Sequence, residues 1–135
     1  MIGSLLAQYT AAKSGEEIWA HTVGLQNYPG DVHDRILSAA SKGVTFRLIV
    51  DVGSPGLAEF LKLFEPIRQA AIVGSHDNKL RVQGLGGREV IIALPTLTTY
   101  TALRITDENF VAVIKDWYNT KWATLAAHGY IQEPI

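Results

Sequence analysis

The alternation of hydrophobic and polar residues is clearest over residues 78–94, where it predicts a β-hairpin. Leu80 and Val82 alternate with polar neighbours, which is the period-two pattern of a strand with one exposed face. The glycine-rich stretch 84–87 follows, and a tight turn costs little there because glycine tolerates positive φ. The almost wholly apolar run 88–94 predicts a second, more deeply buried strand.

The remaining strands and helices follow from the same kind of pattern. Further strands are predicted over residues 17–23, 44–52, 69–74 and 102–105. Helices are predicted over residues 4–14, 31–41, 54–65 and 106–128, where apolar residues recur every three or four positions. The expected N-terminal caps are Asp31, Ser54 and Thr106, and the expected helix ends are Gly15, Gly43 and Gly129. A strand, a helix and a strand in succession predict a βαβ unit, and the whole chain predicts an α/β fold, a mixed β-sheet with helices on both faces.

The last predicted helix has a wide aromatic stripe that includes Trp117, Tyr118 and Trp122. Such a stripe is typical of a dimer surface, because aromatic residues are enriched at interface cores. It is equally typical of a helix face in the core, and periodicity does not separate the two. We assign Trp117 to the core and leave Trp122 open.

Composition restricts the classes of function. The 135 residues suit a single domain over residues 1–135, with a helix within 1–15 and a loose tail over 130–135. A net charge of −1 lacks the basic excess of a nucleic-acid-binding domain, so no direct nucleic-acid binding is evident. The chain has no cysteine, which excludes disulfides, thiolate metal sites and cysteine nucleophiles. No apolar run approaches the roughly 18 residues of a membrane span and no signal peptide is recognisable, so we expect no membrane association and a cytoplasmic location.

Polar residues gather just before and within the hairpin, and they are the first candidates for a binding site. They are His76, Asp77, Asn78, Lys79 and Arg81. One interpretation is a ligand pocket in which Lys79 and Arg81 bind a small anion or a sugar hydroxyl. The other is a solvated turn followed by an exposed strand face, because charged groups usually mark the solvated side.

Other candidates lie at the ends of the predicted strands. Asp51 and Ser54 follow a central strand, and ligands of open α/β sheets gather at such ends, although simple capping of the next helix also explains them. His21 and His76 line one cleft if their strands end on the same side. A metal site needs at least three converging groups, so we expect none, and we expect no cofactor.

Three stretches carry a family resemblance through their order and spacing. They are residues 36–51 (ILSAASKGVTFRLIVD), 76–95 (HDNKLRVQGLGGREVIIALP) and 102–125 (ALRITDENFVAVIKDWYNTKWATL). Together they resemble one half of a phospholipase D-like fold, in the degenerate form of archaeal TrmB-like transcriptional regulators.

Active phospholipase D-like proteins carry the motif HxKxxxxD, in which the histidine attacks phosphorus and the lysine balances charge. Lys79 matches the lysine, whereas the histidine position falls on Asp77 and the aspartate position on Gly84. His76 is one residue too early, and a one-residue shift along a strand tends to turn a side chain to the other face. The motif is therefore not intact.

The resemblance implies three alternative functions. The degenerate motif favours a non-enzymatic regulatory, dimerisation or ligand-sensing domain related to archaeal transcriptional regulators. The first alternative is a phosphodiesterase or nuclease that acts as a homodimer, with His76 as nucleophile and Lys79 as charge stabiliser. The second alternative is a protein-interaction module without a ligand. A homodimer is expected from the family likeness and from the commonness of twofold assemblies.

Overall fold

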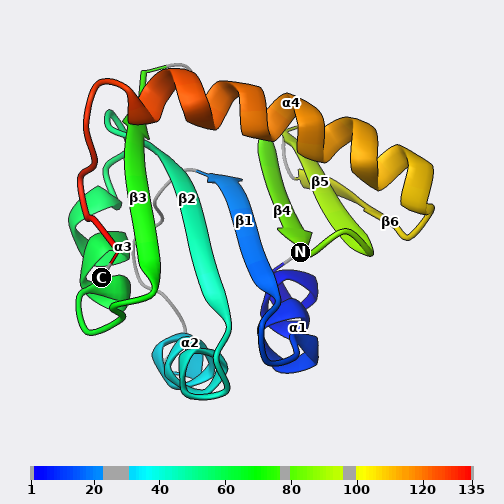
Figure 1. Ribbon diagram of the computed structural model, residues 1–135, viewed down its shortest axis with the longest axis horizontal. Coiled ribbons are helices and arrows are strands. Elements are labelled where there is room, and N and C mark those ends of the chain that lie inside the picture. The colour runs from blue at the N-terminus through cyan, green and yellow to red at the C-terminus, as the bar shows by residue number, and fades with distance from the viewer. Residues whose placement is uncertain (1, 23–30, 77–79, 96–99, 135) are drawn as a thin grey trace.

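The computed structural model describes residues 2–22, 31–76, 80–95 and 100–134, which form a sheet with helices on both sides (Figure 1). The helices of this part of the chain are α1 (Ile2–Ala11), α2 (Asp31–Ser41), α3 (Leu57–Phe64) and α4 (Glu108–Ala126). The strands are β1 (Glu17–Thr22), β2 (Thr45–Asp51), β3 (Ala70–Ser75), β4 (Arg81–Leu85), β5 (Glu89–Pro95) and β6 (Tyr100–Ile105). The α/β class predicted from the sequence is confirmed.

The six strands form one mixed sheet in the order β3-β2-β1-β4-β5-β6. Strands β1, β2 and β3 are mutually parallel, so the predicted βαβ unit is present. Strand β4 is antiparallel to β1, and β4, β5 and β6 continue as antiparallel neighbours. Helix α4 crosses one face, here called the α4 face, and α1, α2 and α3 cover the other, here called the three-helix face (Figure 1).

Each face of the sheet carries its own hydrophobic layer, and β1 shows how the strands supply both. Ile18 and Ala20 pack in the layer under the three helices, whereas Trp19 packs in the layer under α4. Alternation along the strand puts neighbouring side chains on opposite faces. Tyr118 of α4 is fully buried against Trp19, with ring centroids 5.2 Å apart.

Strand β4 differs from the prediction of a half-exposed strand, because all five of its residues are buried. Helix α1 covers the polar side of this strand. Gln83 Nε2 donates to the Leu5 carbonyl at 2.9 Å and to Gln8 Oε1 at 2.9 Å. The polar residues Arg81 and Gln83 of this strand are therefore covered by the three-helix face and do not point to solvent. The glycine turn of the hairpin is confirmed, with Gly86 at φ 54°.

Two predicted caps are wrong, one by two residues and the other by a single residue. Helix α3 begins at Leu57 after Gly56, because Ser54 instead forms a turn in which its amide donates to the Asp51 carbonyl at 3.2 Å. Helix α4 is capped by Asp107, whose carboxylate accepts from the Phe110 amide at 2.9 Å. The aspartate follows Thr106 directly, and both residue types are good caps.

The tail after α4 is attached to the edge of the sheet, which differs from the expected loose end. The Ile72 amide donates to the Gln132 carbonyl at 2.9 Å, and the Ile131 amide donates to the Ile72 carbonyl at 2.7 Å. Gln132 Nε2 also donates to the carbonyls of Phe64 and Ile67 at 2.9 and 3.0 Å. These bonds cover part of the open edge of β3.

Candidate functional site

A groove lies between the C-terminal end of β3 and the C-terminal half of α4, on the α4 face. Its volume is about 700 Å³, and its lining includes Ser75, His76, Asp116, Trp117, Thr120 and Lys121. His76 is exposed there. The groove lies where parallel strands end, which is where open α/β sheets place ligands.

His21 lies beneath this groove and is held by two contacts. Its Nδ1 lies 2.6 Å from the Leu80 carbonyl oxygen, and its Nε2 lies 2.5 Å from Lys121 Nζ. A carbonyl only accepts hydrogen bonds, so Nδ1 carries the proton and Nε2 accepts from the lysine ammonium. The side chain is 2% exposed. His21 is therefore a neutral imidazole that positions Lys121, and its second nitrogen is occupied.

Trp117 forms the aromatic wall of the groove, so its assignment to the core is wrong. It is 40% exposed, and its ring lies edge-on to His21 at 5.4 Å between centroids. Lys121 Nζ is 5.9 Å from the same ring. Tyr118, its sequence neighbour, takes the core position, while Trp122 is half-buried and stacks on Tyr118 at 6.3 Å. Consecutive residues of a helix point about 100° apart around its axis, so Trp117 and Tyr118 face different surroundings. The broad aromatic stripe in the sequence does not show which of the two faces the core.

Tyr118 connects the α4 face to two strands. Its hydroxyl donates toward the carbonyls of Ala20 and Arg47, at 3.1 and 2.8 Å. Burial raises the pKa of this phenol well above its usual value. The hydroxyl therefore stays protonated and serves as a structural donor rather than as an acid or base.

Arg81 lies on the opposite face of the sheet from the groove. Its side chain is only 9% exposed, so the interpretation of a solvated strand face is wrong for this residue. In β4, Val82 belongs to the layer under α4, and the alternation of side chains therefore sends Arg81 and Gln83 toward α1. Arg81 and His76 consequently do not meet in one site.

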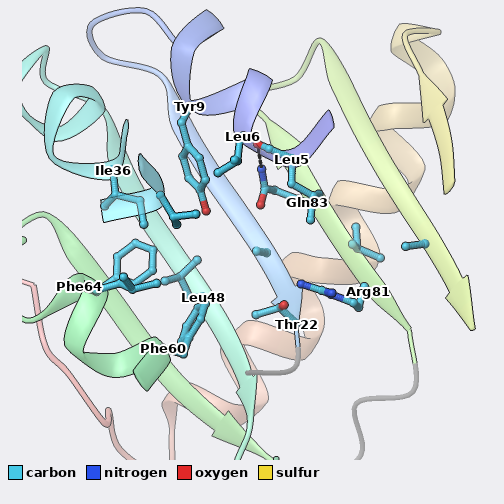
Figure 2. Close-up of a pocket in the computed structure, with 15 residues that line it drawn as sticks. Leu5, Leu6, Tyr9, Thr22, Ile36, Leu48, Phe60, Phe64, Arg81 and Gln83 are labelled. Atoms are coloured by element: carbon cyan, nitrogen blue, oxygen red, sulfur yellow. Dashed lines mark hydrogen bonds between the residues drawn. The ribbon is translucent and has the colours of Figure 1, made fainter. Parts of the chain in front are cut away.

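Arg81 instead lines a pocket between the sheet and the three helices, here called the Arg81 pocket (Figure 2). The volume of this cavity is about 40 Å³. Its lining is mostly apolar and includes Leu5, Leu6, Ile36, Leu48, Phe60 and Phe64. Figure 2 shows the guanidinium of Arg81 extending from β4 toward Thr22 at the end of β1. The sequence pattern placed Arg81 on a strand but did not indicate which helix would cover it.

A polar network borders this pocket, and it holds the side chain of Gln83 through Gln8. Gln8 Nε2 donates to Glu89 Oε1 at 3.1 Å, and Arg104 donates to Glu89 Oε2 at 2.9 and 2.7 Å. Burial tends to raise the pKa of the Glu89 carboxyl, but the hydrogen bonds from Arg104 and Gln8 outweigh it and leave the pKa lowered. Glu89 therefore stays ionised and holds Gln8 in place.

The other predicted site residues separate into two groups. Asp51 is opposite Ser75 in the sheet, and its Oδ1 accepts from the Gly53 amide at 2.9 Å, so it forms part of the same turn as Ser54. Asp77, Asn78 and Lys79 lie outside the described residues. Within the described ranges, no group of three or more histidine, cysteine or acidic residues is arranged to hold a metal ion.

Gly84 is packed directly against Trp19, and this contact bears on the resemblance to phospholipase D. A Cβ added at Gly84 would lie 1.9 Å from Trp19 Cε2 and 2.0 Å from Cζ2. Trp19 is fully buried, and its Nε1 donates to the Gly86 carbonyl at 2.8 Å. The position that corresponds to the motif aspartate therefore has no room for a side chain.

Solved structures of other proteins share this architecture. TrmBL2, described as an archaeal chromatin protein with a novel mode of DNA binding, matches 91% of this chain with a TM-score of 0.69 and 20% identity. Nuc from Salmonella typhimurium, a phospholipase D family member, matches 90% with a TM-score of 0.66 and 11% identity. The chain has a phospholipase D-like fold. NucT from Helicobacter pylori matches 88% with a TM-score of 0.61 and 16% identity. No protein-family model and no curated protein matches the chain.

The matches also correct one expectation. The absence of a basic excess led to the view that no nucleic-acid binding is evident, and the similarity to a chromatin protein that binds DNA contradicts this view. Net charge is a sum over the whole chain, so a value near zero does not by itself argue against nucleic-acid binding. This chain spans 48% of TrmBL2, 86% of Nuc and 85% of NucT. None of the helices in the described segments is both long and apolar enough to cross a membrane.

Proposed function

We propose that this chain is a non-catalytic, phospholipase D-like regulatory module that works in a DNA-associated assembly and senses a small ligand. The observation that carries the proposal is the contact between Gly84 and Trp19. The motif aspartate of the active family would stand at Gly84, where the Trp19 ring already occupies the space of a Cβ. A carboxylate placed there would be buried against an indole, and burying a charge without a partner is costly.

The histidines of the α4 face support the same conclusion. Because His21 Nε2 accepts from Lys121, that nitrogen has no lone pair available to attack phosphorus. His76 is the histidine that lines the groove, and it stands one position before the motif histidine. A groove with a cation and an aromatic wall can still bind an anionic group without reacting with it.

The regulatory part of the proposal includes dimerisation. Phe110, Val113 and Trp117 are exposed at 44%, 63% and 40% and recur at helical spacing on the outside of α4. Exposed large apolar residues in a row commonly mark an interface. TrmBL2, whose description includes DNA binding, supports the placement in a DNA-associated assembly.

A plasmid assay tests the non-catalytic claim. Supercoiled plasmid is incubated with the protein and with the His76→Ala variant, and nicked product is followed by gel electrophoresis. We expect the same background for both proteins. Nicking by the unchanged protein that disappears in His76→Ala would contradict the proposal.

A phosphodiesterase or nuclease remains the second candidate, and one observation favours it. His76 is exposed in the same groove as Lys121, so a histidine and a cation share one site at the strand ends. In this alternative, Lys79 adds a second cation and a symmetric dimer supplies the second histidine. The rate would then rise more steeply than in proportion to protein concentration, because the active form is the dimer. A rate equal to the background at every protein concentration would exclude this candidate, and a rate strictly proportional to concentration in a monomeric protein would exclude only an active site shared by two subunits.

A further inference from the structure

A second pocket on the α4 face lies at the N-terminal ends of the parallel strands, whereas the groove lies at their C-terminal ends. Its volume is about 350 Å³, which is within the range of small-molecule sites. The lining includes the first residues of β1 and β2, Trp122 of α4, and Tyr130 and Pro134 of the segment after α4. That segment turns back along β3 and is hydrogen-bonded to it (Figure 1). We call this site the Trp122 pocket, and it shares no lining residue with the groove among the described residues.

Two aromatic rings form one side of the Trp122 pocket. Trp122 is half-buried and Tyr130 is 39% exposed, and their ring centroids lie 6.0 Å apart with the planes inclined at 50°. Trp122 also stacks on the buried ring of Tyr118 at 6.3 Å, which limits its movement. Unpaired nucleobases stack on rings of this kind, and stacking requires no charge on the ligand. The rings therefore favour a planar aromatic ligand.

Arg47 gives the pocket a hydrogen-bond donor that is held in one orientation. Its Nε and Nη2 donate to the two carboxylate oxygens of Glu17 at 3.0 and 2.8 Å, and Nη2 also donates to Asn119 Oδ1 at 2.7 Å. The guanidinium carbon lies 5.2 Å from the centroid of the Tyr118 ring and 5.4 Å from that of the Trp122 ring. Within the described ranges, these bonds use Nε and Nη2 and leave the N–H groups of Nη1 for a ligand.

Gln69 adds a hydrogen-bond acceptor to the same lining. Its Nε2 donates to the Ala40 carbonyl at 2.8 Å, which fixes the amide, and its Oε1 accepts no hydrogen bond from the described part of the chain. Guanine has two neighbouring acceptors, O6 and N7, which are the commonest base partners of arginine, and it has N–H donors at N1 and N2. Adenine carries an amino donor in place of O6, and this donor would face the guanidinium. The polar groups of the pocket therefore match guanine better than adenine.

We propose that the Trp122 pocket binds a guanine base, with its ring against Trp122 and Tyr130, its O6 and N7 toward Arg47, and its N–H donors toward Gln69. The charge of Arg47 is balanced by Glu17, so the pocket recognises the edge of a base and not a phosphate. The guanidinium over Trp122 also occupies the place of a ligand cation. The base belongs either to a free nucleoside or to an unpaired position of a DNA strand, because both present the same ring. This site is separate from the groove, so the inference goes beyond the proposed function.

An NMR titration of the unchanged protein with deoxyguanosine tests the proposal, with deoxyadenosine as the comparison ligand. The indole Nε1–H and arginine Nε–H signals are followed. We expect saturable shifts of the Trp122 and Arg47 signals with a dissociation constant of about 0.1–1 mM, and at least about tenfold weaker binding of deoxyadenosine. We further expect nuclear Overhauser contacts between the base and the ring of Trp122 or Tyr130. Shifts that do not saturate, contacts only to Trp117, or equal binding of the two nucleosides would overturn the proposal.

Two variants with a matched control separate the two parts of the recognition. Tyr130→Leu should weaken deoxyguanosine by about fivefold or more, because one stacking ring is lost. Phe110→Leu removes a similarly exposed ring from the other end of α4 and should bind as the unchanged protein does. Arg47→Lys keeps the charge beside Glu17 but loses the planar fork, so its preference for guanine over adenine should fall below about threefold. Circular dichroism checks that each variant is folded. Unchanged binding by folded Tyr130→Leu, or an unchanged preference in folded Arg47→Lys, would overturn the proposal.

A short single strand that carries one guanine among thymines separates the two sources of the base. Tighter binding of this strand than of deoxyguanosine, lost when adenine replaces the guanine, would assign the pocket to single-stranded DNA. Equal or weaker binding of the strand would assign it to a free nucleoside. Strand binding that does not depend on the guanine, together with no saturable binding of deoxyguanosine, would overturn the proposal. The plasmid assay concerns the groove, so its outcome and that of this titration are independent.

Discussion

The contact between Gly84 and Trp19 makes a sharp prediction for Gly84→Ala. The new methyl would lie 1.9 Å from Trp19 Cε2, a distance that two carbon atoms do not adopt, so one element must move. Trp19 has little freedom, because Nε1 is bonded to the Gly86 carbonyl and its ring packs against Tyr118. Overpacked cores typically lose about 1–3 kcal/mol, and this fixed ring places the expected loss of unfolding free energy near 3 kcal/mol or above. That is a large part of the roughly 5–15 kcal/mol available to a domain.

Urea unfolding followed by far-ultraviolet circular dichroism measures this loss, and Gly87→Ala is the matched control. A Cβ at Gly87 has no neighbour within 4 Å, so this change should alter the stability by less than about 1 kcal/mol. In a Trp19→Leu background, Gly84→Ala should cost much less, because the ring atoms nearest to Gly84 are gone. Equal effects of Gly84→Ala and Gly87→Ala would refute the claim that Trp19 fills the position of the motif aspartate.

Further predictions concern stability and its pH dependence. The Arg88 guanidinium hydrogen-bonds to Glu16 at 2.8 and 2.9 Å and lowers the pKa of that carboxyl from 4.5 to about 2. Because the folded-state pKa lies below the unfolded value, this stabilisation is present above pH 4.5 and is lost as the pH falls toward 2. The side chains of Glu16 and Arg88 are 21% and 42% exposed, so we expect this ion pair to contribute only about 1 kcal/mol to the free energy of unfolding. Urea unfolding at several pH values measures this contribution, which should be absent in Glu16→Gln. The same pH dependence in Glu16→Gln and in the unchanged protein would contradict it. Tyr118→Phe removes the hydroxyl that donates to the Ala20 and Arg47 carbonyls. We expect the free energy of unfolding to fall by about 1–3 kcal/mol in the same assay, because both acceptors are near the core. An unchanged stability would show that these hydrogen bonds contribute nothing.

The sequence was sufficient for the fold because the signals of the individual elements agree. The apolar runs that became β2 and β3 and the glycine turn after β4 identified a mixed sheet without any tertiary information. The cap positions shifted because Ser54 and Thr106 each stand near a second residue that can end or begin a helix. Packing decides which of two neighbouring residues caps the helix, and the intrinsic preferences of the residues do not include that packing.

The candidate site was harder to predict because it depends on which element covers which face. Arg81 and His76 were grouped by their closeness in sequence, but they lie on opposite sides of the sheet. The covering of β4 by α1 involves residues more than seventy positions apart, as the bond from Gln83 to Leu5 shows. Lys121 was missed as a partner of His21 for the same reason, since a hundred residues separate them. Only the long-range pairing of elements reveals these sites.

The proposed module has no phosphodiesterase activity, and hydrolysis of a chromogenic substrate is the measurement that checks this. Bis(4-nitrophenyl) phosphate is incubated with the unchanged protein, with His76→Ala and with Lys121→Met over a range of protein concentrations. We expect a rate equal to the background for all three proteins and independent of protein concentration. A rate that rises with the concentration of the unchanged protein and is abolished by His76→Ala would contradict it, and would show that the groove on the α4 face is an active site.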